Sequence, residues 1–96
     1  MQAKKVDGNQ AQVVAALRKI GCTVQLLHKV GSGCPDILAG IRGINILFEI
    51  KDGPNKLNEL QKNWHATWKG QVCTVWGPLE AVEVVQSIIK NKDFFD

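Results

Sequence analysis

Residues 44–51 have the sequence INILFEIK, an apolar run that closes on two charged side chains. A short, almost continuous run of isoleucine, leucine and phenylalanine predicts a strand that is covered on both faces. Because strand side chains alternate between faces, Glu49 and Lys51 project from one face and Ile50 from the other. The run therefore predicts a buried strand that carries a carboxylate and an ammonium side by side at its end.

A second carboxylate is expected at the same point. Asp36 lies thirteen residues before Glu49, directly after a glycine-rich turn. Residues 36–39 predict a short strand, and residues 40–43 predict a tight turn into the strand 44–50. Two strands joined by a tight turn can lie side by side, which would bring Asp36 next to Glu49. Two carboxylates and an ammonium at one point can hold a divalent metal ion against a phosphate.

Hydrophobic periodicity predicts the elements on either side of these strands. Residues 10–20 have the apolar spacing of a helix, with Asn9 or Asp7 as its cap and Gly21 at its end. Residues 23–27 and 72–76 predict strands, and residues 57–69 and 79–90 predict helices. Residues 91–96 show no pattern.

The helix predicted for residues 57–69 carries an apolar stripe formed by Leu57, Leu60, Trp64 and Trp68. Such a stripe normally faces a core, so we expect the tryptophans to lie in the core or in a dimer interface. Base stacking is the less favoured interpretation of these indoles.

Length and composition limit the fold and the compartment. The chain has 96 residues, which corresponds to one domain over 1–96, and a net charge of +3, which permits nucleic-acid binding without arguing for it. The sequence contains no apolar run of about 18 residues and no secretory signal at its start, so we expect a cytoplasmic protein without a membrane segment. The three cysteines lack metal-ligand spacing and are expected to be reduced, partly buried thiols.

The motif and the element order together resemble a known family. The order helix-strand-strand-strand-helix-strand-helix, with Pro-Asp followed by Glu-x-Lys, is similar to the PD-(D/E)xK nuclease superfamily. Within it, the chain most resembles the small VRR-Nuc (virus-type replication-repair nuclease) domains. The segments that carry the resemblance are GSGCPDILAG at 31–40, FEIK at 48–51 and LNELQKNW at 57–64, together with Gln10. The resemblance implies an α/β fold with a restriction-endonuclease-like αβββαβ core, a mixed sheet flanked by helices, and a C-terminal helix.

The resemblance also implies an active site. Its catalytic residues would be Asp36, Glu49, Lys51 and Gln61. The ligands of Mg²⁺, with Mn²⁺ as a substitute, would be the carboxylates of Asp36 and Glu49 and the backbone carbonyl of Ile50. Lys51 would contact the scissile phosphate or the attacking water, and Gln61 would orient one of these groups.

The chain departs from the family at the first helix. Family members commonly carry a glutamate near its start, whereas here no glutamate precedes Glu49. Asp7 is the nearest acid, and a helix cap explains it as well as a metal ligand does.

Six further residues are candidates for DNA binding. They are Lys29, Ser32, Gly33, Arg42, Lys56 and Lys62. The four basic side chains would flank the site and neutralise phosphates, although each taken singly also fits a solvated surface charge. Ser32 and Gly33 could present a hydroxyl or backbone amides to a phosphate, or simply form a flexible turn.

The function implied is a metal-dependent endonuclease that cuts branched DNA, such as Holliday junctions, as a homodimer. The setting would be the cytoplasm of a bacterial host, with the protein encoded by a phage. The alternatives are a nuclease for flaps or nicks, a nucleic-acid-binding module without catalysis, and a purely structural interaction domain. Metal-dependent cutting separates the enzymes from the other two.

Overall fold

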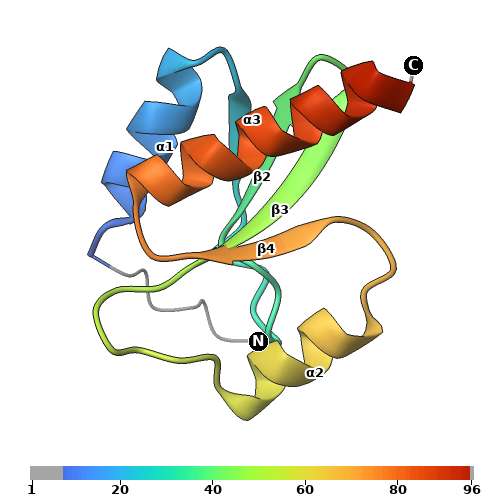
Figure 1. The fold of residues 1–96 in the computed structure, drawn as a ribbon. Coiled ribbons are helices and arrows are strands. Elements are labelled where there is room, and N and C mark those ends of the chain that lie inside the picture. The colour runs from blue at the N-terminus through green and yellow to red at the C-terminus, as the bar shows by residue number, and fades with distance from the viewer. Residues whose placement is uncertain (1–7, 96) are drawn as a thin grey trace.

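The fold is α/β, with a four-stranded mixed sheet flanked by helices and a C-terminal helix (Figure 1). The computed structural model describes residues 8–95, without the side chains of residues 93–95. In chain order the elements are α1 (Gln10–Lys19), β1 (Thr23–Leu26), β2 (Ile37–Ile41), β3 (Ile44–Ile50), α2 (Glu59–Thr67), β4 (Val72–Val75) and α3 (Pro78–Phe95). This order confirms the predicted fold class and is consistent with a restriction-endonuclease-like αβββαβ core.

The strands lie in the sheet in their chain order, β1-β2-β3-β4. β1 pairs antiparallel with β2, β2 pairs antiparallel with β3, and β3 pairs parallel with β4. The parallel pair requires a crossover connection, and α2 lies within it. In this register Ile37 faces Phe48, so the start of β2 lies beside the end of β3, as the sequence predicts.

The turn between β2 and β3 is shorter than predicted. β2 continues through Gly40 and Ile41, and only Arg42 and Gly43 connect the strands. Both residues have positive φ angles, 51° and 80°, which is typical of a type I′ hairpin turn. Such turns match the twist of paired strands, so two residues suffice where four were expected.

One face of the sheet builds the core against α1 and α3, which pack against each other (Figure 1). From β3 this face presents Ile46, Phe48 and Ile50, all fully buried. They meet Leu17 of α1 and Val85 of α3 within one continuous apolar cluster. Full burial of one such side chain contributes roughly 1.5–3 kcal/mol, so this layer holds the strand ends in place.

The cysteines match their predicted state. Cys22, Cys34 and Cys73 are reduced thiols, and each is fully or partly buried. Burial raises the pKa of the Cys22 and Cys73 thiols, because the thiolate loses solvation in the apolar core.

α2 lies away from α1 and α3, below the sheet in Figure 1. The predicted core position of its apolar stripe is wrong, because Gln61 is its buried residue while Trp68 remains 46% exposed. Trp64 is half-buried and stacks on Trp68, with ring centroids 4.6 Å apart. The alternative position of the stripe in a dimer interface stays a prediction.

The predicted helix ends need correction at two elements. α2 begins at Glu59 rather than at residue 57, because Asn58 caps it. α3 extends to Phe95 rather than to residue 90. The segment after residue 90 contains no glycine or proline to stop the helix, and Lys92 anchors it by donating a hydrogen bond to the Arg42 carbonyl at 3.1 Å.

All three helices begin at the same end of the sheet, the end where β2 starts and β3 finishes. At the start of α1, Asn9 donates a hydrogen bond to the Lys51 carbonyl. At the start of α2, Gln61 donates one to the Glu49 carboxylate. α3 begins three residues after β4, whose last residue, Val75, pairs with Ile50. Among the described helices, none combines the length and apolar character needed to cross a membrane.

Candidate active site

Asp36 and Glu49 lie at the junction of β2 and β3. The Asp36 backbone N–H donates to the Phe48 carbonyl at 2.9 Å, which continues the ladder by one residue. The Asp36 side chain crosses to the neighbouring strand, where its Oδ2 accepts the Ile50 N–H at 2.6 Å. Asp36 is 1% exposed and Glu49 is fully buried. The tight turn therefore places Asp36 and Glu49 on adjacent strand ends, as expected, and a shared metal site stays a prediction.

Two further polar side chains meet the Glu49 carboxylate. Lys51 Nζ lies 3.8 Å from Glu49 Oε2, and Gln61 Nε2 donates to the same oxygen at 3.4 Å. Lys51 and Gln61 are both buried. The four predicted catalytic residues thus gather at one place, although Gln61 comes from a separate helix.

Gln61 is held by the start of its own helix. Its Oε1 accepts the Asn58 backbone N–H at 2.9 Å, and its backbone N–H donates to Asn58 Oδ1 at 2.9 Å. This is a reciprocal capping box, which satisfies two backbone donors that a helix start otherwise leaves unpaired. The oxygen of the Gln61 side-chain amide therefore bonds the helix cap, and its nitrogen bonds Glu49. These two bonds connect the first turn of α2 to the site.

Gly33 brings the glycine-rich loop against the same turn. Its φ is 84°, a region that residues with a Cβ rarely adopt. A Cβ placed on Gly33 would overlap the carbonyl of Leu60. The need for glycine here is therefore explained by the close approach of α2, and a role of Gly33 at a phosphate stays a prediction.

Asn9 lies at this site, although the sequence predicts it only as a cap of the first helix. It occupies the N-cap position of α1, but its side chain makes no capping hydrogen bond. Its Nδ2 instead donates to the Lys51 carbonyl and to the Trp76 carbonyl, each at 2.9 Å. Asn9 and its neighbour Gln10 are both buried. Two adjacent amide side chains at a helix start are the sequence feature that could have indicated a buried polar role for Asn9. Asp7, the alternative cap or ligand, lies outside the described residues.

The candidate DNA-binding residues separate into two groups. Lys29, Ser32 and Gly33 lie in the loop that leads to Asp36, and Lys56 and Lys62 lie before and within the first turns of α2. Arg42 lies in the β2–β3 turn, at the opposite end of β3 from Glu49. A strand of seven residues spans about 20 Å, so the predicted position of Arg42 beside the site is wrong.

The donor set suits a hard divalent cation. Asp36 and Glu49 supply carboxylate oxygens, and Ile50 between Glu49 and Lys51 supplies a backbone carbonyl. Two carboxylates on adjacent strand ends attract a cation. Mg²⁺ prefers oxygen ligands and keeps several waters, so few protein ligands are needed. Within residues 8–95, no group of three histidine, cysteine or acidic side chains forms a fuller metal cage.

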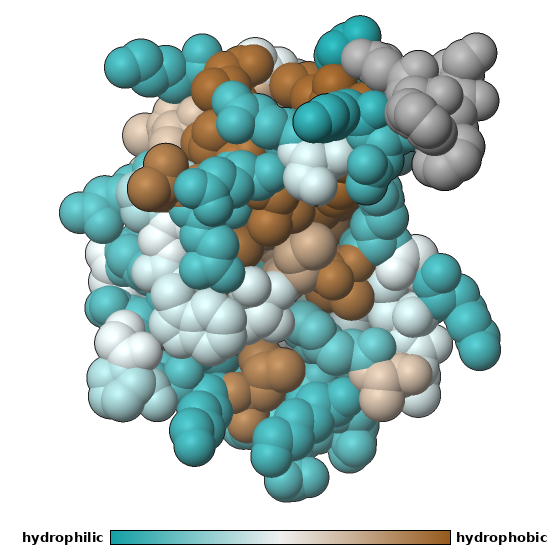
Figure 2. All heavy atoms as spheres, viewed as in Figure 1, coloured by the Kyte–Doolittle hydropathy of each residue, from teal (hydrophilic) through white to brown (hydrophobic). Residues whose placement is uncertain are grey.

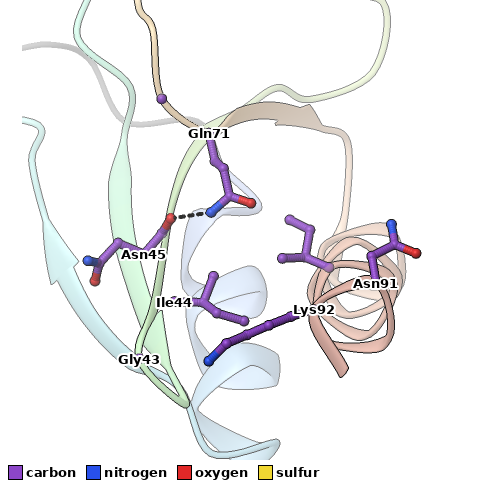
Figure 3. Close-up of a pocket in the computed structure, with 8 residues that line it drawn as sticks. Gly43, Ile44, Asn45, Gln71, Asn91 and Lys92 are labelled. Atoms are coloured by element: carbon purple, nitrogen blue, oxygen red, sulfur yellow. Dashed lines mark hydrogen bonds between the residues drawn. The ribbon is translucent and has the colours of Figure 1, made fainter. Parts of the chain in front are cut away.

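A groove of about 650 Å³ lies at the opposite end of the sheet (Figure 3). Ile44 and Lys92 line it, and Gln71 Nε2 donates to the Asn45 carbonyl at 2.8 Å across one side. None of its lining residues is acidic. The groove therefore lacks the carboxylates of a Mg²⁺ site and is separate from the Asp36–Glu49 pair.

No protein-family profile, curated protein or solved structure matches this chain. The resemblance to the VRR-Nuc nucleases therefore rests on the motifs and on the order of elements that the sequence predicts. The observed order agrees with that prediction.

Proposed function

We propose that the protein is a Mg²⁺- or Mn²⁺-dependent DNA endonuclease of the VRR-Nuc type. The observation that carries this proposal is the fully buried Glu49 carboxylate, which Lys51 and Gln61 both contact beside Asp36. Burying ionised groups costs several kcal/mol for each ion, and apolar residues of similar volume are often at least as stable. Two buried acids on adjacent strand ends are therefore better explained by chemistry than by stability.

The chemical type of each site residue suggests its role in the proposed reaction. Asp36, Glu49 and the Ile50 carbonyl would hold the divalent ion, which lowers the pKa of a water and offsets negative charge on a phosphate when bound. The Lys51 ammonium is a compact positive charge suited to the scissile phosphate. The Gln61 amide both donates and accepts, so it can orient Glu49 or a water.

The substrate we propose is branched DNA, such as a Holliday junction, cut by a homodimer. A four-way junction needs two symmetric cuts, and a two-fold dimer supplies two related sites. The exposed side chains of Lys29, Lys56 and Lys62 support a polyanionic substrate at this end of the molecule. By resemblance, we further propose a phage-encoded enzyme acting in the bacterial cytoplasm.

The test is cleavage of labelled DNA by wild type and Asp36→Asn. A synthetic four-way junction, a flap and a linear duplex are incubated with Mg²⁺, Mn²⁺ or EDTA. We expect paired nicks on the junction with either metal, no cutting in EDTA, and loss of cutting in Asp36→Asn. Glu83→Gln is the matched control, because it removes an exposed acid from α3 and should cut normally.

The other outcomes separate the rival functions. Cutting of flaps in preference to junctions would retain the active site and replace the substrate. Binding of DNA without cutting, by folded protein in either metal, would indicate a binding module and overturn the proposal.

A further inference from the structure

Large apolar side chains are exposed at the end of the sheet that holds the candidate active site. The described residues of this kind are Leu26, Val30, Leu60, Trp68, Trp76 and Leu79. All except Trp68 lie at the end of the sheet that holds Asp36 and Glu49, because they end β1, follow β1 or β4, or belong to the first turn of α2 or α3. Exposed apolar residues scattered singly need no explanation, but their concentration at one end does.

Leu60 is the exposed apolar residue nearest to the site along the chain. It directly precedes Gln61, whose amide contacts Glu49, yet 61% of Leu60 is exposed. Figure 2 shows hydrophobic atoms exposed within a hydrophilic surround over the region of α2. A ligand that contacts Leu60 would therefore lie next to Gln61, one of the site residues.

The backbone of Leu60 is fixed even though its side chain is exposed. The capping box between Asn58 and Gln61 encloses it on the helix side. Gly33 lies against its carbonyl on the other side, so close that no Cβ would fit. Because its backbone is held on both sides, Leu60 can contact a ligand without displacement of the helix start.

The charges around Leu60 indicate what that ligand is. Lys29 adjoins the exposed Val30 in the loop that contains Gly33, and Lys56 and Lys62 lie before and after Leu60 along the chain. All three lysines are exposed, and Lys62 has an acidic neighbour, Glu59, at 3.5 Å. A two-fold contact with a second copy through this surface would bring lysines towards lysines. Nucleic acid, with apolar base faces between phosphates, complements both features.

Building on the nuclease function proposed above, we propose that Leu60 is a wedge that contacts unstacked bases next to the scissile phosphate. Apolar side chains such as leucine can insert between base steps, at the cost of separating the stacked bases. That cost is smallest where stacking is already interrupted. The wedge would therefore make the enzyme select DNA with a break in stacking at the cut, as at a branch point.

The test compares Leu60→Ser with wild type on two substrates. One is a fully paired four-way junction, and the other is the same junction with unpaired nucleotides inserted at the cleaved branch. We expect the variant to cut the paired junction more slowly by about tenfold or more, and the pre-opened junction at nearly the wild-type rate, because the bases are already unstacked. Leu60→Met keeps an apolar side chain of similar volume and should restore most of the rate.

Leu79→Ser is the matched control, because Leu79 is a more exposed leucine at the same end of the sheet but belongs to α3, away from Gln61. It should cut both junctions at the wild-type rate. Equal losses on both junctions in Leu60→Ser, or no loss on either, would overturn the wedge while leaving the nuclease intact. Conversion of a wild-type dimer to a monomer by Leu60→Ser, seen by size-exclusion chromatography with light scattering, would instead assign Leu60 to an interface between copies. Wild type that cuts neither junction would remove the nuclease function and the wedge together.

Discussion

Asn9 shows how a single side chain can connect three elements at the candidate site. Its amide donates both hydrogens, one to the carbonyl that follows β3 and one to the carbonyl that follows β4. The Lys51 N–H in turn donates to the Val75 carbonyl at 2.9 Å. Both the N–H and the carbonyl of Lys51 are therefore hydrogen-bonded. The bond from Asn9 helps to position the lysine.

Replacing Asn9 by alanine should therefore lower both stability and cutting. The change leaves two backbone carbonyls without their donor, and each buried unsatisfied group costs about 1–3 kcal/mol. We expect a loss of roughly 2–4 kcal/mol in the free energy of unfolding, measured by urea denaturation. Asn9→Asp should be no better, because a carboxylate cannot donate to a carbonyl.

Asn63→Ala is the control for this prediction, since it removes an exposed asparagine from α2. It should change stability by less than about 0.5 kcal/mol. An Asn9→Ala protein as stable and active as wild type would show that the two hydrogen bonds are dispensable.

The residues of the site differ in how visible they are in the sequence. Glu49 and Lys51 are predictable because strand alternation is a local rule, and Asp36 because a tight turn brings the next strand alongside. The role of Asn9 is not predictable from the sequence, since the two carbonyls that it bonds lie 42 and 67 positions away. A helix cap is the default expectation for an asparagine at a helix start, and only the packing of α1 against the strand ends redirects its amide.

At the scale of elements, α2 separates what hydrophobic periodicity can predict from what it cannot. The stripe of Leu60, Trp64 and Trp68 correctly predicts a helix, because apolar residues recur at helical spacing. Periodicity does not say whether the same chain covers that stripe. Here the residue that α2 buries is the polar Gln61, held by its capping box and by Glu49. The helix is thus positioned by its first turn rather than by an apolar face.

Gly33→Ala should disturb α2 through this first turn. A Cβ at Gly33 would overlap the Leu60 carbonyl, so α2 must shift and Gln61 must move from Glu49. A shift of this kind should reduce the cutting rate by roughly a hundredfold, in addition to the strain of a positive φ angle. The rate is measured under single-turnover conditions, with thermal unfolding to confirm that the variant is folded.

Gly53→Ala is a matched control for that prediction. Gly53 also has a positive φ, 55°, but a Cβ there would meet no atom within 4 Å. It should show the backbone strain without the shift of α2, with a loss of about 1 kcal/mol in stability and near-normal cutting. Equal activity losses in the two variants would mean that strain, and not the approach of α2, explains Gly33.

At the scale of the whole molecule, the fold concentrates polarity at one end of the sheet. α1, α2 and α3 all begin there, and helix N-termini carry partial positive charge that favours nearby anions. This end also holds the buried carboxylates of Asp36 and Glu49. The tight turn predicts that the start of β2 lies beside the end of β3, whereas the start of all three helices at this end is seen only in the structure. Only Arg42 was assigned to the wrong end, since the length of β3 separates the hairpin from the site.

The concentration of buried carboxylate at this end leads to a prediction about the stability of the whole domain. The fold brings Asp36 and Glu49 onto adjacent strand ends, and unfolding separates them, so a divalent ion that binds both should bind the folded state far better than the unfolded chain. At a free ion concentration of about 100 times the Kd, such binding adds about 2.7 kcal/mol to the free energy of unfolding. For a domain of this size, that gain corresponds to a rise in Tm of about 10 °C or more. Differential scanning calorimetry with Mg²⁺ or Mn²⁺ should show the rise in wild type and in Glu83→Gln, and Asp36→Asn should lose it. A rise of equal size in Asp36→Asn would place the bound ion elsewhere on the molecule.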